Sequence, residues 1–421
     1  MRHIQQIIEY FLRKKWLGIL LITLLVSGVG VSTIYRGAFS QKQRTDLAVF
    51  FKAAEMVHEG RAEHIYGIET RRHWHYVYTP LLAILLAPAV GLPFVIPVTI
   101  HYVMSLAGLG IIFFLSRHFT PDKKNAVWQI VLSALLCIPV FLDTLTRGQL
   151  GILMLFFQTA IFFSYLKNHK ILAGFLLALA VSLKTSPLAV LFVYFLFRKE
   201  WSLLLSAACG LVFFIFLYPS VIIGFEENWE LLTIWHGLMK EGSSINAYKN
   251  YLWSELFTPF AADNQSFYAV LTRFCWRGES DFIANPSHGV RWISLSMGII
   301  SVLLLFMKHT RSTPKSGEDV STEDKLVEFS LYPVAMLLFS PVTQIHHYVS
   351  LYFMFLAAFF LWNRKKTWLP LAGVFCSASL FLLALVIEPL AYLGFPMWGA
   401  FILWGILLFC PTPSAKSSGG A

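Results

Sequence analysis

Hydrophobic residues run through the chain in long blocks separated by short polar segments. Most blocks approach the ~20 residues that a helix needs to cross the ~30 Å hydrocarbon layer of a membrane. They are too long for the strands of a membrane barrel, and backbone groups in lipid must be hydrogen-bonded within the chain, so we expect helices. The expected spans lie near residues 16–35, 97–116, 126–142, 149–166, 171–183, 187–197, 202–223, 290–307, 327–342, 347–362, 367–388 and 395–410.

Two places in this pattern leave the number of spans open. Residues 79–92 are apolar but short and contain three prolines, so they form either a re-entrant pair of half-helices or a full crossing. The blocks 171–183 and 187–197 are also short and are separated by a break that begins at Lys184. We therefore predict an all-α polytopic membrane protein with 11–13 spans. Residues 1–411 are expected to form one membrane domain, followed by a disordered tail at 412–421.

Composition and charge support this class. Hydrophobic residues make up 57% of the 421 residues and charged residues 13%, whereas a soluble domain has about a quarter charged. The first apolar block is long and has no small-residue cleavage site after it, so we expect a retained helix rather than a signal peptide. The five cysteines stand singly, which argues against a disulfide framework and against a CxxC metal site.

The net charge of +10 follows from membrane topology rather than from nucleic-acid binding. Short loops with an excess of lysine and arginine are typical of the cytoplasmic side. The basic clusters are Arg13–Lys15, Arg117 with Lys123 and Lys124, Lys167 with Lys170, Arg198 with Lys199, and Arg364–Lys366. The polar stretch 308–325 is expected to be a flexible cytoplasmic loop, and the long segments 36–78 and 224–289 are expected outside.

Each external segment has its own pattern. The first contains TDLAVFFKAAEMVHEG, an amphipathic helix that we expect to lie in the membrane interface. Its apolar face carries Leu47, Phe50, Phe51, Ala54 and Val57, and its polar face carries Lys52, Glu55 and Glu59. The second segment is rich in aromatic residues, which suit either the headgroup level or sugar rings; they include Trp229, Trp235, Tyr248, Tyr251, Trp253 and Trp276.

Small groups of polar residues occur at the outer ends of these spans or in the long loop. They are Asp46; Arg147 and Gln149 after Asp143; Lys184 with Thr185 and Ser186; Gln344, His346 and His347; and Asp263, Asn264, Gln265 and Ser266 followed by Arg273. Because separate loops bring carboxylate, amide, cation and imidazole groups to one membrane depth, we expect one composite site. It should face away from Lys124 and Lys365.

Structural interpretations of the same residues stay open. Asp46 could complement the positive end of its helix, Lys184 could extend to the interface, and the histidines could bond backbone groups. An ionisable group between apolar runs is nevertheless a functional candidate. Adjacent histidines diverge on a helix, and the sequence contains no HExxH, Gly-rich phosphate loop, GxSxG or Cys/His cluster. We therefore expect no metal, no cofactor and no soluble-nucleotide chemistry.

The stretches that carry these polar groups resemble glycosyltransferase family 87, in the C-type superfamily of polytopic transferases that use polyprenyl-phosphate sugars. They occur in the family's order over about 40–350. They are TDLAVFFKAAEMVHEGRAEHIY, YTPLLAILLAPAVGLP, RGQLGILMLFFQTAIFFSYLKNHKILAGFLLALAVSLKTSPLAVLFVYFLFRKEW, NQSFYAVLTRF and SPVTQIHHYVSLYF. The chain departs from the family pattern at Thr79, Leu150 and Gln344, which bears on the sugar and acceptor more than on the fold.

The resemblance implies an inverting transferase on the outer face of a bacterial cytoplasmic membrane. It would move mannose, or a related hexose or pentose, from a polyprenyl-phosphate donor to a lipid or glycan acceptor without a cofactor. The resemblance makes Asp46 the catalytic base and places His346 and His347 in the catalytic site. The family's lysine falls on Lys184. We expect Lys184, Arg273, Arg147 and Gln149 to bind the donor phosphate, and Tyr78, Asn264, Gln265 and Ser266 to bind substrate.

The alternative function is transport or flipping of lipid-linked saccharides. Transporters usually bind near the membrane midplane on broken helices that belong to two related halves. The sequence contains no convincing internal repeat, and the polar groups lie at the outer rim of the expected spans. A scaffold without activity would not explain why separate loops carry matched polar groups. The sequence therefore favours the transferase.

Overall fold

The computed structural model describes residues 15–39, 45–68, 74–120, 123–242, 258–275, 286–312, 320–365 and 367–411. Helices dominate these residues, and no strand occurs among them apart from one isolated bridge between Asn264 and Gln344. The predicted all-α class is confirmed. The predicted tail and four of the external aromatic residues lie outside the described residues: 412–421, Tyr248, Tyr251, Trp253 and Trp276.

The helices follow the apolar blocks of the sequence. The amino-terminal half contains α2 (Lys15–Ile34), α3 (Asp46–His58), α4 (Pro80–Leu86), α5 (Val95–Ser116), α6 (Lys123–Leu136), α7 (Ile138–Arg147), α8 (Gly151–Leu166), α9 (Lys170–Leu183), α10 (Thr185–Leu188) and α11 (Leu191–Phe197). The remainder contains α12 (Trp201–Leu211), α13 (Tyr218–Ile223), α14 (Phe225–Gly242), α16 (Phe267–Cys275), α17 (Pro286–Ser312), α18 (Thr322–Phe339), α19 (Leu351–Lys365), α20 (Trp368–Val386), α21 (Glu388–Tyr392) and α22 (Phe395–Phe409). Every expected span coincides with one of these helices or with a broken pair.

Fewer helices are long enough to cross a membrane than the 11–13 predicted. By length and composition, five segments of the described chain qualify: Val95–Ser116, Trp201–Ile223, Gly289–Arg311, Ile345–Arg364 and Trp368–Val386. A sixth results if α6 and α7 form one span bent by 56°, a bend that Pro139 explains because proline cannot donate to the carbonyl of the preceding turn. Other blocks, such as α4, are too short for ~30 Å of hydrocarbon, in agreement with the re-entrant alternative for 79–92.

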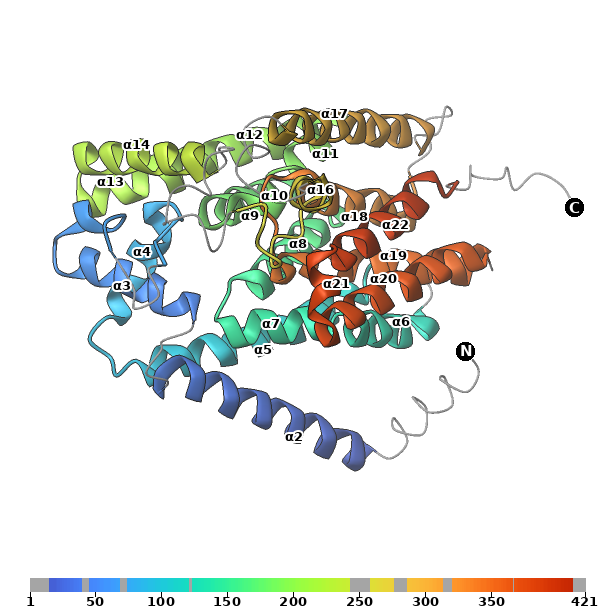
Figure 1. The fold of residues 1–421 in the computed structure, drawn as a ribbon, viewed down its shortest axis with the longest axis horizontal. Coiled ribbons are helices and arrows are strands. Elements are labelled where there is room, and N and C mark those ends of the chain that lie inside the picture. Colours follow the sequence, from blue (N-terminus) through green and yellow to red (C-terminus); the bar gives the residue numbers. More distant parts are fainter. Residues whose placement is uncertain are drawn as a thin grey trace, which may run out of the picture.

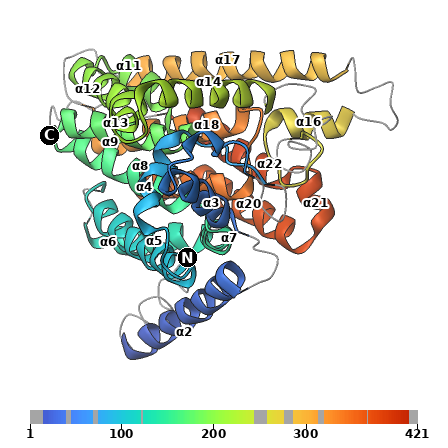
Figure 2. The ribbon, with the colours of Figure 1, turned by 90° about the vertical axis from the view of Figure 1, so that its left-hand side faces the viewer.

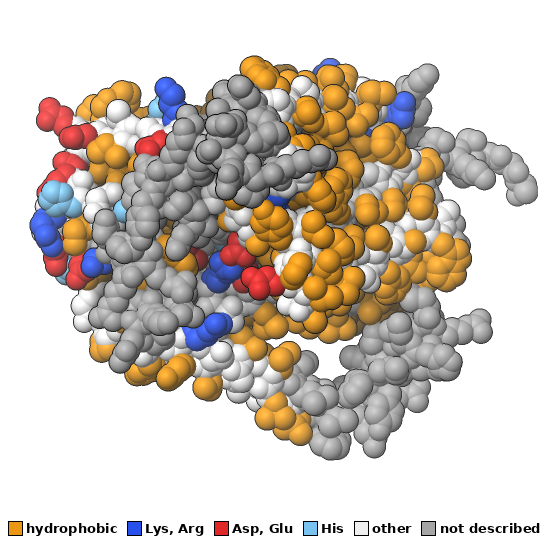
Figure 3. Space-filling model, in the orientation of Figure 1, with side chains coloured by type: hydrophobic (Ala, Val, Ile, Leu, Met, Phe, Trp, Pro, Cys, Tyr) orange, Lys and Arg blue, Asp and Glu red, His pale blue; other side chains and the backbone are white. Residues whose placement is uncertain are grey.

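The centre of the bundle is α19. Its residues from Tyr352 to Leu361 are buried on every side, as expected for a helix that is apolar all round, and α6, α18, α20 and α22 surround it. By contrast, α17 exposes Trp292, Leu295 and Ile299, as a lipid-facing helix does. In Figure 1, α3, α4, α13 and α14 lie together at one end of the bundle. Figure 3 shows many charged side chains at that end, whereas hydrophobic side chains cover much of the rest.

Two predicted external or polar segments differ from expectation. The apolar and polar faces of α3 are as predicted, since Leu47 and Phe50 are buried while Lys52 and Glu55 are exposed. The apolar face, however, belongs to the protein core and packs on α4 rather than standing free for lipid; Figure 2 shows α3 and α4 beneath α14. The prediction of a flexible loop over 308–325 is wrong at its ends, because α17 continues to Ser312 and α18 begins at Thr322.

A π-helical turn (η4, Val212–Leu217) joins α12 to α13 and fixes the position of α14. Pro219 cannot donate a hydrogen bond to the carbonyl of Ile215 one turn earlier. The side-chain amide of Asn228 on α14 donates to that carbonyl at 3.1 Å and lies 3.4 Å from the carbonyl of Phe216. This bond holds the first turn of α14 against the span, so that the rest of α14 extends over the site described next.

Candidate active site

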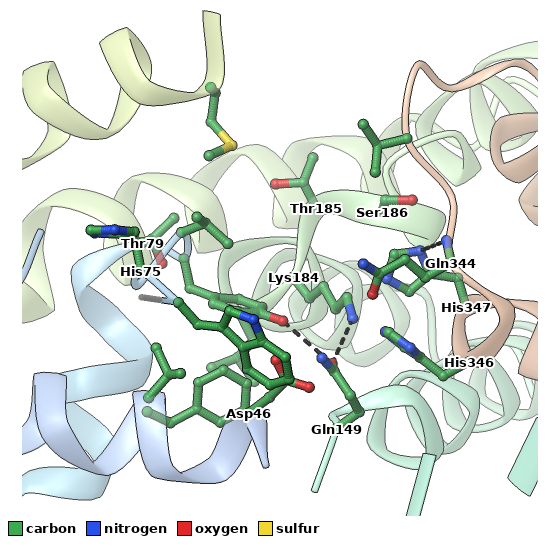
Figure 4. Close-up of a pocket in the computed structure, with 18 of the residues that line it drawn as sticks. Asp46, His75, Thr79, Gln149, Lys184, Thr185, Ser186, Gln344, His346 and His347 are labelled. Atoms are coloured by element: carbon green, nitrogen blue, oxygen red, sulfur yellow. Dashed lines mark hydrogen bonds between the residues drawn. The ribbon is translucent and has the colours of Figure 1, made fainter. Parts of the chain in front are cut away.

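A cavity of about 260 Å³ opens where α3, α14, the α7–α8 turn, the break after α9 and the 340–347 segment meet. Figure 4 shows side chains from these segments pointing toward one another. Seven of the residues to which the sequence analysis gave a role in the site line it: Asp46, Tyr78, Arg147, Gln149, Lys184, His346 and His347. Thr185, Ser186 and Gln344 from the same polar groups line it as well. Segments far apart in the chain therefore contribute to one site, as the sequence pattern predicts.

Two glycines allow the segments to approach the α7–α8 turn closely. Gly148 has a φ of +65°, and a Cβ atom there would lie 2.9 Å from the Cβ of Leu47. A Cβ on Gly151 would lie 3.0 Å from the carbonyl oxygen of His346. Larger residues would push both neighbours away, and the left-handed backbone at 148 also favours glycine. Gln149 is thereby held between the segments that carry Asp46 and His346.

Gln149 connects the charged groups of the cavity. Its side-chain oxygen accepts a hydrogen bond from Nζ of Lys184 at 3.2 Å and lies 3.4 Å from the hydroxyl of Tyr78 (Figure 4). The same amide is close enough to the carboxyl group of Asp46 to act on its pKa. Gln149 thus lies between a carboxylate and a cation, and it neutralises neither.

Asp46 lies in the first turn of α3, and its side chain is partly buried in the wall of the cavity. This loss of solvation raises its pKa above the ordinary value for aspartate, although the amide of Gln149 and the charges of Arg147 and Lys184 act in the opposite direction. A raised pKa makes the carboxylate a stronger base, while the nearby cations favour its ionised form. The arrangement suits a group that must accept a proton.

Lys184 lies at the break between α9 and α10. Its backbone is extended (φ −153°, ψ 106°), which ends α9 and turns the side chain into the cavity. The residue is 9% exposed, and its ammonium group lies 5.9 Å from the centre of the Tyr78 ring. A buried cation beside a cavity is suited to binding an anion.

The adjacent histidines have different surroundings. The backbone N–H of Gln344 donates to Nδ1 of His347 at 3.2 Å, so the neutral ring of His347 must carry its proton on Nε2. His346 is 1% exposed, and neither of its ring nitrogens has a hydrogen-bond partner in the described chain. No group of three or more His, Cys, Asp or Glu residues among the described residues could hold a metal ion.

Arg147 is paired with two carboxylates at the rim of the cavity. Its Nε donates to Asp143 at 2.9 Å and its Nη2 donates to Asp263 at 3.1 Å. Much of its charge is therefore compensated by these partners, whereas the charge of Lys184 faces the cavity.

The other predicted site residues lie beside the cavity and do not line it. Arg273 donates to the carbonyls of Pro259, Ala261, Asn264 and Tyr392 at 2.7–2.9 Å. The residues 264–266 are bonded to the backbone of residues 341–343. The amide N–H of the Asn264 side chain donates to the carbonyl of Pro341, and the amide oxygen accepts from the N–H of Thr343. The backbone N–H of Gln265 donates to the carbonyl of Thr343, and the Ser266 hydroxyl donates to the carbonyl of Pro341. This placement does not support direct phosphate or substrate contacts. Arg273 ties residues 259–264 to Tyr392, whereas Asn264, Ser266 and the backbone of Gln265 hold the segment that carries Gln344 and the histidines.

Several lining residues were not singled out as site residues from the sequence. They include Trp74, His75, Thr79, Trp235 and Met239. The sequence left Trp235 open between the headgroup level and a sugar ring. In the structure its indole N–H donates to the carbonyl of Val77 at 3.1 Å, which attaches α14 to the cavity wall. The dense aromatic and histidine run at 73–78 was the available signal for Trp74 and His75.

The sequence model of glycosyltransferase family 87 matches residues 76–320, more than half of the chain. The chain belongs to glycosyltransferase family 87. This family 87 protein is therefore a membrane glycosyltransferase with several apolar helices suited to a multi-pass arrangement. The match includes Gln149 and Lys184, whereas Asp46 and both histidines lie outside it. No curated protein and no solved structure matches the chain at a significant level.

Proposed function

We propose that this family 87 glycosyltransferase moves a hexose or pentose, with mannose the first candidate, from a polyprenyl-phosphate donor to a lipid or glycan acceptor. The observation that carries the proposal is the cavity that the carboxylate Asp46 and the buried cation Lys184 line together, with Gln149 between them and bonded to Lys184. One group is suited to accept a proton, and the other is suited to hold an anionic leaving group.

The donor half of the reaction uses Lys184 and His347. A sugar on a lipid phosphate carries its own leaving group, and the chemistry then requires fixed positive charge and hydrogen-bond donors near the phosphate oxygens. Lys184 supplies charge, and Nε2–H of His347 supplies a directed donor. Arg147 contributes at longer range because two carboxylates hold its guanidinium.

The acceptor half of the reaction uses Asp46. Its carboxylate takes the proton of the acceptor hydroxyl as that oxygen forms a bond to the anomeric carbon. The bond from the anomeric carbon to the phosphate oxygen breaks, and its electron pair leaves with the phosphate. Attack opposite the leaving group inverts the anomeric centre.

The site is proposed to face outside the cytoplasmic membrane, opposite the basic loops. Cysteines replacing Lys52, on the exposed face of α3, and Arg364, at the end of α19, test this orientation. In a background without reactive cysteines, a membrane-impermeant thiol reagent should label position 52 in intact cells and position 364 only after the membrane is opened. The reverse pattern would place the site in the cytoplasm and contradict a lipid donor displayed outside.

Purified protein incubated with polyprenyl-phosphate mannose and with the corresponding glucose and arabinose lipids tests the activity itself. Transfer of one sugar to an added lipid or glycan acceptor, identified by mass spectrometry, is the expected result. Movement of intact donor between the leaflets of a vesicle without transfer would instead establish the flippase function.

A further inference from the structure

A second carboxylate lies behind the histidine pair, and the proposed reaction does not use it. Asp143 is on α7, which packs directly on the 3₁₀ turn (η6, Ile345–Ser350) that carries His346. Its Oδ2 is 3.8 Å from Nδ1 of His346, and both atoms are buried without a hydrogen-bond partner in the described chain. A movement of about 1 Å would bring them to hydrogen-bonding distance and satisfy both.

The other oxygen of Asp143 is already occupied. Arg147 donates to Oδ1 at 2.9 Å and fixes the carboxylate, so Oδ2 is the oxygen that faces His346. A carboxylate beside Nδ1 favours a proton on that nitrogen. The ring of His346 is 1% exposed and has no hydrogen-bond partner in the described chain, and such burial disfavours a positive charge on it. His346 is therefore neutral, with its lone pair on Nε2.

We propose that Asp143 is a positioning residue that holds His346 as the Nδ1–H tautomer, so that Nε2 accepts a hydrogen bond from a hydroxyl group of the bound sugar. His347 has the opposite tautomer because Gln344 occupies its Nδ1. The two rings, with centres 4.4 Å apart, thus offer one acceptor and one donor. Figure 4 shows His346 beside Gln149 and His347 beside Gln344.

This inference rests on the proposed function and adds a chemical requirement to it. A sugar phosphate presents both kinds of group: a hydroxyl donates to His346, and a phosphate oxygen accepts from His347. Two donors side by side would instead favour a ligand with two acceptors. The tautomers therefore select a phosphate-linked sugar with a free hydroxyl near its linkage.

The test is a double-mutant cycle on binding of polyprenyl-phosphate mannose to the purified full chain, measured by calorimetry. Asp143→Asn keeps an oxygen for Arg147 but aims an N–H at His346, which forces the other tautomer. His346→Gln places an amide near the position of Nε2, and the amide can rotate to present its oxygen whatever Asp143 does. Asp263→Asn is the matched control, since it removes the other carboxylate of Arg147 and does not approach His346.

We expect Asp143→Asn to weaken donor binding at least about tenfold, His346→Gln to weaken it less, and the double variant to bind like His346→Gln alone. Asp143→Glu, which keeps the carboxylate, should bind like the wild type and guards against a simple folding defect. An equal loss from Asp143→Asn in both His346 backgrounds, or an equal loss from Asp263→Asn, would overturn the inference. Donor binding by the wild type without sugar transfer would overturn the proposed reaction, while the cycle still decides the role of Asp143.

Discussion

Two buried cations occupy neighbouring parts of the molecule and differ in what surrounds them. Arg273 is 6% exposed, and four backbone carbonyls accept hydrogen bonds from its Nε and Nη1. Lys184 is 9% exposed, donates to the amide of Gln149 and lines a cavity. The first cation ties loops together and does not line the cavity, whereas the second directs its remaining hydrogen-bonding capacity into the cavity. A buried cation therefore indicates a binding function only where its hydrogen-bond donors face a cavity.

The largest expected effect is on the rate of sugar transfer, when Asp46 in the cavity is replaced. Asp46→Asn keeps the size and hydrogen-bonding capacity of the side chain but cannot accept a proton. Removal of a general base costs about 10²–10⁴-fold in rate, so we expect transfer to fall at least about a hundredfold while donor binding persists. Initial rates of sugar transfer by purified protein measure this.

Two measurements separate a catalytic Asp46 from a purely structural one: the remaining rate of transfer and the pH dependence. A charge at a helix end would contribute only ~0.3–1 kcal/mol to stability. If Asp46→Asn kept more than about a tenth of wild-type transfer, Asp46 would have that structural role. Because burial raises its pKa, the carboxyl group tends to be protonated at a higher pH than ordinary aspartate. Wild-type transfer should therefore rise with pH through that raised pKa. At pH values above that pKa, the partly buried charge of the ionised carboxylate destabilises the folded state. Asp46→Asn removes this charge and should therefore not lower the melting temperature at neutral pH.

Lys184→Met should affect the donor in particular. The substitution keeps the length of the side chain and removes the charge. Hydrogen bonds to charged groups contribute about 1.5–3 kcal/mol, so donor affinity should fall about 10–100-fold. Equilibrium binding of polyprenyl-phosphate mannose measures the loss, and expression and membrane insertion should be unchanged. Unaltered donor affinity would make Lys184 an interfacial lysine.

Arg273→Met is the matched substitution in the other region and should give the opposite result. The four backbone carbonyls that accept from Arg273 would lose that donor, and each buried polar group left without a partner costs about 1–3 kcal/mol of stability. The melting temperature should fall by several degrees, whereas the folded protein should bind donor within about threefold of wild type. A donor-binding defect as large as that of Lys184→Met, without loss of stability, would remove the distinction between the two cations.

The smallest effect concerns the turn that holds the cavity together. Gly148→Ala and Gly60→Ala both place a side chain at a positive φ, which costs about 1–2 kcal/mol. Only at 148 does the new Cβ also meet Leu47, since nothing lies within 4 Å of a Cβ at Gly60. Gly148→Ala should therefore lower both stability and transfer more than Gly60→Ala. Equal losses in melting temperature and rate would show that the contact with Leu47 carries no strain.

The sequence predicted the helices well and the number of full-length spans poorly. Apolar blocks reveal where helices form because lipid and core both favour them, so α5 and α20 match their predicted ranges closely. The same pattern does not tell whether an apolar face meets lipid or protein. The apolar face of α3 was assigned to the interface, although Phe50 is buried in the core. The block 171–183 was counted as a span although it is short, and α9 (Lys170–Leu183) has only that length.

The site was partly predictable for a related reason. Polar residues at the ends of apolar blocks marked Asp46 and Lys184, and these do line one cavity. The same signal marked Asn264 and Arg273, which do not line the cavity and which donate to backbone carbonyls through the Asn264 amide and through Nε and Nη1 of Arg273. Whether a marked residue keeps a polar atom available for a ligand depends on contacts between distant segments, which the sequence pattern does not show. Asp143 shows the converse, because only the fold brings it beside His346.

The close approach of three distant segments at the α7–α8 turn also bears on how the protein is made. Thr144 and His346 are 202 residues apart in the chain, and Tyr78 and Gln149 are 71 apart. During synthesis, α3 and the turn can meet early, but the histidine wall arrives only after most of the chain has been inserted. An unfinished chain would thus expose a lysine and a carboxylate to lipid or water without their final neighbours. Premature termination before residue 347 should therefore leave a membrane-inserted but incomplete site, a natural substrate for quality-control proteases.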